Sequence, residues 1–166
     1  MTPEDVPLSG RFYRITFTTD ADRVLGGVIH HEGRFHHNGQ PAFYCSPTPE
    51  AAAAAVKVYA KLDDPPRVII PLDVTNARIC DLRSPDTCAA LGIQMNTPSI
   101  PWVPQRAKGA PAASWQASDA VRASGMDGMI YTCRRKPRLR WHLVLFHWNT
   151  AGHAQVRAAA PQQFIL

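Results

Sequence analysis

The stretch Gly33-Arg34-Phe35-His36-His37-Asn38-Gly39 forms a loop between two short strand-like segments, with a glycine at each end. Tyr13-Arg14 comes twenty residues before Arg34, and Tyr44 comes ten residues after it. Guanidinium groups stay charged and bind phosphate oxygens through paired hydrogen bonds. Two arginines and a tyrosine held on neighbouring strands therefore predict a diphosphate site beside an aromatic ring, which indicates a nucleotide ligand.

Length and composition indicate one globular domain over residues 1–166. The chain is 45% hydrophobic, long enough to bury one sizeable core and too short for two independent domains. No stretch approaches the roughly 20 apolar residues of a membrane-spanning helix. The N-terminal residues 1–5 are acidic and lack the regions of a signal peptide. We expect a cytoplasmic protein with no membrane contact.

The four cysteines, Cys45, Cys80, Cys88 and Cys133, are not arranged in Cys-x-x-Cys pairs. This spacing predicts no zinc site and, in a reducing compartment, no structural disulfide. The net charge is +5, and the excess is concentrated in residues 134–140. Such a basic segment is typical of a solvated hairpin tip, and it also suits phosphate binding.

Local patterns predict a mixed α+β fold built on a small, largely antiparallel sheet with flanking helices. The expected strands are residues 12–17, 41–45, 67–74, 77–82, 129–133 and 141–146. The expected helices are residues 49–61 after a Thr48 cap, 85–91, and 114–125 with Ser114 as cap and Gly125 as terminator. Residues 20–22 are expected to form a turn region. Four prolines make residues 96–113 an irregular segment, interpreted as a lid or partner-binding loop.

The order of these pieces resembles that of the RES-domain proteins, toxins of bacterial toxin-antitoxin pairs. The resemblance is carried by Tyr13-Arg14, by Glu32-Gly33-Arg34-Phe35, by Ala42-Phe43-Tyr44 before a helix, and by the segment 127–134 followed by 143–146. It covers nearly the whole chain, and it implies a fold similar to that of ADP-ribosyltransferases.

The family resemblance implies that NAD is the substrate. No metal is expected, because no carboxylate or cysteine completes a convincing ligand set with the histidines near Arg34. Carried over by position, Arg14 and Arg34 hold the pyrophosphate, Tyr44 stacks on the nicotinamide or its ribose, and Cys133 takes the place of the family serine. Arg34 and Tyr44 are also assigned to the catalytic group. The alternative for each residue considered alone is a surface or ion-paired arginine or a core aromatic.

The family glutamate is missing from this chain, since by spacing it falls near Ala55 in a run of alanines. In this chemistry the carboxylate stabilises the positive charge that develops as nicotinamide departs. Glu50 does not obviously replace it, because five residues turn a helix by about 140°. Histidines 30, 31, 36 and 37 surround the arginine loop, and we assign His36 a catalytic role in partial compensation.

The resulting hypothesis is a toxin that cleaves NAD and transfers ADP-ribose to a cellular protein. The alternatives are an NAD glycohydrolase or phosphorylase and a catalytically inactive protein that only binds a partner. A nucleic-acid-binding module on residues 134–140 with Trp141 is the least favoured interpretation. The resemblance also implies a helix-turn-helix antitoxin as partner.

Overall fold

The computed structural model describes residues 6–132 and 140–165. Cys133 and residues 134–139, which make up nearly all of the basic segment, lie outside the described residues, and so do the predictions that rest on them. The elements, in chain order, are β1 (Val6–Phe17), η1 (Thr18–Gly26), β2 (Phe43–Cys45), α1 (Pro49–Lys57), β3 (Arg67–Asp81), α2 (Pro85–Leu91), η2 (Thr97–Ser99), α3 (Trp102–Ala107), α4 (Ser114–Ser124), β4 (Gly128–Thr132), β5 (Trp141–Leu145), β6 (Gln155–Ala158) and β7 (Gln162–Phe164).

The sheet follows the order β1-β3-β4-β5-β2, and β6 and β7 pair with further parts of β3. Among the strand pairs within the described ranges, only β3 with β4 is parallel. Beyond β2, Tyr13 and Ser46 form a two-way backbone bridge that returns the chain to β1. The predicted α+β architecture with a largely antiparallel sheet is therefore confirmed.

The long strand β3 replaces the two separate strands predicted at residues 67–74 and 77–82. The break expected between them coincides with Asn76, whose φ is 55°, opposite a register shift between Leu8 and Gly10. Asn tolerates this left-handed conformation, and the backbone N–H of Asn76 donates to the Ser9 hydroxyl. The local irregularity thus bends a single strand without ending it. Strands β6 and β7 were not predicted.

The segment 96–113 is more regular than predicted, because it contains η2 and α3. Pro98 and Pro104 lie in the first turn of these helices, where the missing proline N–H is not needed for a helical hydrogen bond. A similar correction applies to residues 18–26, which form the 3-10 helix η1, whereas only a turn at residues 20–22 was predicted. Prolines here start helices, so their number alone did not indicate irregular structure.

The three predicted helices are present, and two of them have changed ends. Helix α2 has the expected bounds, whereas α1 ends at Lys57 and does not reach residue 61. The Thr48 hydroxyl caps α1 by accepting from the backbone N–H of Ala51, as predicted. Ser114 does not cap α4 but is its first residue, and Gly125 ends that helix in the left-handed conformation.

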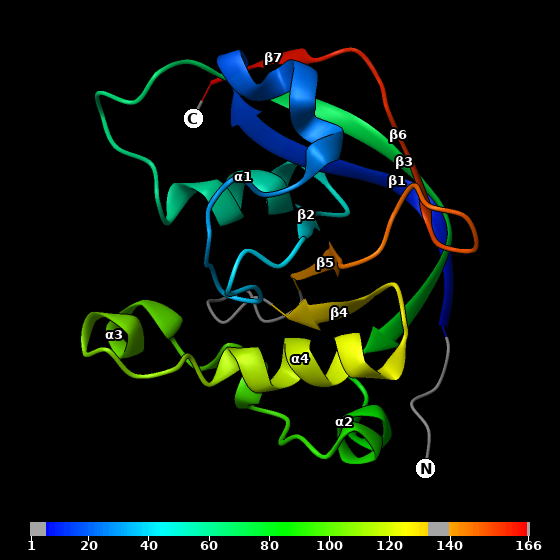
Figure 1. The fold of residues 1–166 in the computed structure, drawn as a ribbon. Helices are drawn as coiled ribbons and strands as arrows, with labels where there is room; N and C mark the ends of the chain where they lie inside the picture. The colour runs from blue at the N-terminus through cyan, green and yellow to red at the C-terminus, as the bar shows by residue number, and fades with distance from the viewer. Residues whose placement is uncertain (1–5, 133–139, 166) are drawn as a thin grey trace.

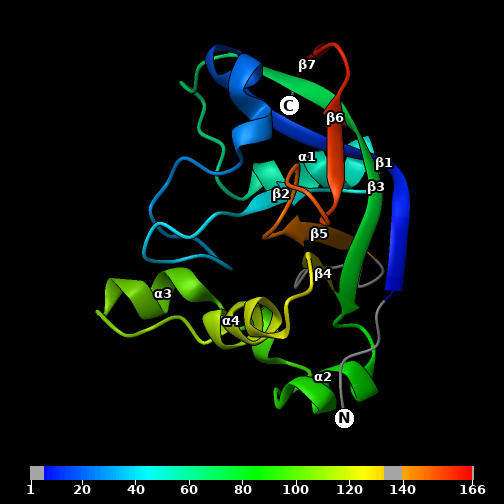
Figure 2. The same cartoon turned by 45° about the vertical axis from the view of Figure 1, so that its right-hand side comes forward.

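The helices gather at two ends of the molecule. Figures 1 and 2 show α2, α3 and α4 together at one end, with α4 alongside β4, and α1, η1 and β7 toward the other end. The long strands β1 and β3 run side by side between them. No helix in the described ranges is both long and apolar enough to cross a membrane.

The strands β4, β5 and β2 separate two parts of the core. Residues on one face, such as Ile130, Leu143 and Phe43, join the cluster under β1, β3 and β6. Residues on the other face, such as Met129 and Val144, pack against α4 and the ring of Phe35. Because strand side chains alternate between faces, each short strand contributes to both clusters.

Candidate functional site

Side chains from three neighbouring strands share the face of the sheet that α4 partly covers. Tyr131 in β4 lies opposite His142 in β5, and Tyr44 in β2 lies opposite Val144 in β5. Ser46 follows Tyr44 by two residues, and its hydroxyl lies 2.8 Å from Nδ1 of His142. The period of two along a strand therefore places polar groups in one row at this end of the sheet.

Arg14 reaches this row from β1, directly after the bridge between Tyr13 and Ser46. Its Nη1 donates to the Tyr44 carbonyl at 2.8 Å, and its guanidinium lies 5.8 Å from the centre of the Phe43 ring. Burial lowers the pKa of Arg14 from its ordinary value of 12.5. An arginine keeps its proton at neutral pH, so the site holds a desolvated positive charge.

Arg34 lies in the loop before β2, and its guanidinium is caged by aromatic rings. The charged group is 4.9 Å from the centre of the Phe35 ring and 5.0 Å from that of Tyr131. Its Nε and Nη2 both donate to the Pro98 carbonyl in η2, at 3.2 and 2.7 Å. These contacts fix the orientation of the planar fork, which lowers the entropy lost when it binds a ligand.

The backbone of the arginine loop is clamped by the start of α4. The Ser114 hydroxyl donates to the Arg34 carbonyl, and the Trp115 indole N–H donates to the Gly33 carbonyl at 2.8 Å. A Cβ at Gly33 would lie 2.3 Å from Cε1 of His36, so only glycine allows this close turn.

The Tyr44 hydroxyl ties the same loop to the sheet. It accepts a hydrogen bond from the backbone N–H of Phe35 at 2.9 Å and lies 2.9 Å from Nδ1 of His36. Its ring stacks near that of Phe35, with 6.5 Å between the centroids. Burial raises the pKa of Tyr44 well above 10, so the hydroxyl stays protonated.

His36 is buried, and both of its ring nitrogens have partners. Nδ1 contacts the Tyr44 hydroxyl, and Nε2 lies 3.2 Å from the His30 carbonyl. Burial lowers the pKa of His36 to about 4, so the ring is neutral at pH 7. This geometry orients Tyr44.

His37 points to a different part of the surface. Its ring stacks on Trp115 at 4.3 Å between centroids, and its Nε2 lies 2.8 Å from the Asp119 carboxylate. His30 and His31 are exposed. Of the four histidines that the sequence singled out, only His36 contacts Tyr44.

Neither Arg14 nor Arg34 forms an ion pair with a carboxylate from the described ranges. The nearest acidic residue in sequence, Glu32, is engaged by Arg106 in two hydrogen bonds of 2.8 and 3.1 Å. Ala55, where the sequence places the missing glutamate, is exposed on α1. The site therefore combines two positive charges, aromatic rings and no compensating carboxylate, an arrangement that suits an anionic ligand.

The structure brings together Arg14, Arg34, Tyr44 and His36, while Cys133 lies outside the described residues. It adds three residues that the sequence interpretation missed: Ser46, Tyr131 and His142. Tyr131 and His142 lie in strands that were predicted, so alternation could have placed them on one face. Their meeting with Ser46 depends on the strand order β4-β5-β2, which no local pattern gives.

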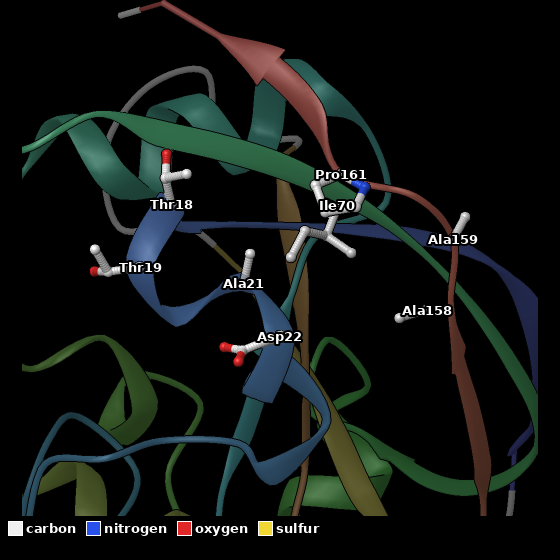
Figure 3. Close-up of a pocket in the computed structure, with 8 residues that line it drawn as sticks. All are labelled: Thr18, Thr19, Ala21, Asp22, Ile70, Ala158, Ala159 and Pro161. Atoms are coloured by element: carbon white, nitrogen blue, oxygen red, sulfur yellow. The ribbon is translucent and has the colours of Figure 1, made fainter.

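Two hollows on the described surface are lined by other residues than these arginines. A cavity of about 480 Å³ is formed by η1, β3 and the segment after β6; Figure 3 shows its lining residues, Thr18, Thr19, Ala21, Asp22, Ile70, Ala158, Ala159 and Pro161. A second, of about 450 Å³, adjoins His37, Trp115 and Asp119. Neither is lined by Arg14, Arg34 or Tyr44. We place the site at the arginines because binding a phosphate requires charge.

Comparisons with known proteins found a family model and a solved structure that are similar to this chain. The model of the family described as "RES domain" matches residues 11–166. A crystal structure of the M. tuberculosis MbcT-MbcA toxin-antitoxin complex contains a chain of similar fold, with a TM-score of 0.61 and 18% sequence identity. That match covers 96% of this chain and 86% of the other. No curated protein matches the sequence.

Proposed function

Since this chain belongs to the RES domain family, we propose that it is the toxin of a toxin-antitoxin pair and that it acts on NAD. The observation that carries the proposal is the pair Arg14 and Arg34, which flank Tyr44 without a carboxylate from the described ranges. A diphosphate supplies the missing negative charge, and arginine binds it bidentately. The fold shared with the toxin-antitoxin complex also supports this assignment.

The residues of the site then act in binding the substrate or in positioning one another. Arg14 and Arg34 bind the diphosphate, Tyr44 offers its ring beside them, and His36 holds the Tyr44 hydroxyl in place. Cys133, which lies outside the described residues, keeps the role that the family resemblance implies, at the position of the family serine. The reaction breaks the bond between nicotinamide and ribose, which releases nicotinamide.

We propose that the product is an ADP-ribosylated protein. The supporting observation is the exposed Ala55 at the position of the family carboxylate, since a site without that carboxylate activates water or phosphate poorly. A docked protein acceptor brings its nucleophile to the reacting carbon by proximity, which compensates for weak activation.

The test is to incubate the purified chain with NAD labelled in its adenylate part and a bacterial lysate, while following nicotinamide. We expect free nicotinamide together with a labelled protein band, both lost in Arg34→Ala. The matched control is Arg157→Ala, which removes an exposed arginine of β6 and should leave both signals. Nicotinamide release without a band would indicate hydrolysis or phosphorolysis, and the absence of both signals would favour a protein that only binds a partner.

The proposed protein partner is a cognate antitoxin with a helix-turn-helix DNA-binding part. The MbcT-MbcA structure is that of a toxin with its antitoxin. In this chain, the uncompensated Arg14 and Arg34 suit an acidic side chain or a C-terminal carboxylate from such a partner. Binding there would compete with NAD.

A further inference from the structure

Ser46 and His142 form a buried polar pair that none of the roles above uses. Ser46 is 4% exposed and His142 3% exposed, and their Oγ and Nδ1 atoms are 2.8 Å apart. The pair adjoins the arginine cage, because the His142 ring lies 5.5 Å from that of Tyr131, which in turn contacts the Arg34 guanidinium.

Sheet closure does not require this pair of side chains. The backbone N–H and carbonyl of Ser46 already bond to Tyr13, at 2.9 and 2.8 Å. An apolar pair would fill a buried position between strands without the desolvation cost of a hydroxyl and an imidazole. A serine hydroxyl on a histidine nitrogen, beside a charged binding group, is instead the arrangement of a hydroxyl prepared to exchange its proton.

We propose that Ser46 and His142 form a proton relay for the transfer reaction, an inference that rests on the proposed function. As the bond between the ribose C1′ and the nicotinamide nitrogen breaks, nicotinamide leaves with the bonding electrons, and the acceptor nucleophile forms a bond to C1′. The acceptor's proton passes to Ser46 Oγ while the Ser46 proton passes to His142 Nδ1. The imidazolium then releases one proton to water, so the sum is NAD plus acceptor giving ADP-ribosyl acceptor, nicotinamide and a proton.

The surroundings of His142 keep its ring neutral at pH 7, which is the form that the relay requires. Burial lowers its pKa to about 4, and the positive charges of Arg34 and Arg140 act in the same direction. Tyr131, packed against the ring from β4, is held neutral because burial raises its pKa. A diphosphate bound to Arg34 offsets one of the two charges, so NAD binding raises the basicity of His142 when the relay is needed.

The experiment compares Ser46→Ala, His142→Gln and the hydroxyl-retaining Ser46→Thr by nicotinamide release with saturating acceptor lysate. We expect kcat to fall by about 100-fold or more in the first two, in the range of a general base, while the KM for NAD changes less than about threefold. Ser46→Thr should recover kcat. The matched control is Ser118→Ala, which removes a fully buried hydroxyl bonded within α4 and should keep the wild-type kcat.

A pH profile separates the relay from a purely structural role. Wild-type kcat should fall at acid pH as His142 becomes protonated, and His142→Gln should lack that limb. Urea unfolding of each variant shows whether a lost rate reflects lost fold.

Unchanged kcat in Ser46→Ala, or an acid limb retained in His142→Gln, overturns the relay and leaves the proposed function standing. A fall in kcat matched by an equal loss of folded protein, not recovered by Ser46→Thr, also overturns it. A wild-type chain that neither binds NAD nor releases nicotinamide overturns the proposed function itself, and the relay with it.

Discussion

Tyr44 joins the arginine loop to the sheet through one hydroxyl. Tyr44→Phe keeps the ring but leaves the Phe35 N–H and His36 Nδ1 without their partner. A buried group left unsatisfied costs about 1 to 3 kcal/mol, and we expect the free energy of unfolding to fall by that amount. Urea denaturation measures it, with Tyr59→Phe at an exposed position as the control. Equal stability of both variants would contradict the role given to this hydroxyl.

His36 makes stability depend on pH. Its pKa is lowered from 6.5 to about 4 in the folded chain, so between these values the unfolded state binds more protons. The part of the unfolding free energy that depends on a neutral His36 is therefore fully present above pH 6.5, and it is lost as the pH falls toward 4. We expect the unfolding free energy to drop by about 1 to 3 kcal/mol for this histidine.

The measurement is denaturant unfolding at pH 7 and pH 4.5 for the wild type and for His36→Asn. The variant should lose less stability on acidification. His142, whose pKa is lowered to a similar value, should maintain part of the slope in both proteins. A slope unaffected by His36→Asn would show that this ring is already protonated, or exposed, in the folded state.

At the scale of elements, β4 depends on a glycine at its first residue. Gly128 pairs with Ile79 of β3 and Leu145 of β5, and a Cβ there would lie 2.1 Å from the Val144 carbonyl oxygen. The atoms that the Cβ would meet belong to the backbone of β5, which cannot move away without breaking its pairing with β4.

We expect Gly128→Ala to destabilise the chain by at least about 3 kcal/mol, as in severe overpacking. Gly26→Ala is the matched control, because no atom lies within 4 Å of its added Cβ, and its effect should stay within about 0.5 kcal/mol. Thermal unfolding of the two variants gives the comparison; similar melting temperatures would refute the close packing of β4.

Helix α1 offers a test of the missing carboxylate. Ala55 is exposed, so Ala55→Glu should fold normally. If this chain is a weakened NAD hydrolase, restoring the carboxylate should raise nicotinamide release without acceptor by 10-fold or more, since one electrostatic group contributes several kcal/mol. Under protein transfer, which we propose, we expect little change. Ala54→Glu, one position away on the same helix, controls for added charge.

At the scale of the whole molecule, the proposed antitoxin should mask the arginine site. Co-expression should give a complex that elutes above the 18.3 kDa of the single chain and releases less nicotinamide than the free chain. If the antitoxin and NAD bind at the same site, inhibition by the antitoxin should weaken as the concentration of NAD rises. Elution of the chain alone would argue against the partner, and inhibition independent of NAD would place the antitoxin elsewhere.

Much of the fold could be predicted from local chemistry. Some signals act over only a few residues, so they can be recognised in the sequence. They are the alternation in residues 12–17 and 141–146, the Thr48 cap and the Gly125 terminator. The predictions that were wrong, such as the break in β3 at Asn76, arose where tertiary pairing overrides a local signal.

The sequence by itself determined which segments form strands and which form helices. It also determined the candidate binding residues Arg14, Arg34 and Tyr44, because both follow from residue chemistry and short spacing. Only the tertiary structure decided that Ser46 meets His142 and that the Pro98 carbonyl holds Arg34. These contacts join residues 96 and 64 positions apart. They depend on strand order and on how α4 and η2 pack against the sheet, which are set by burial of the whole core.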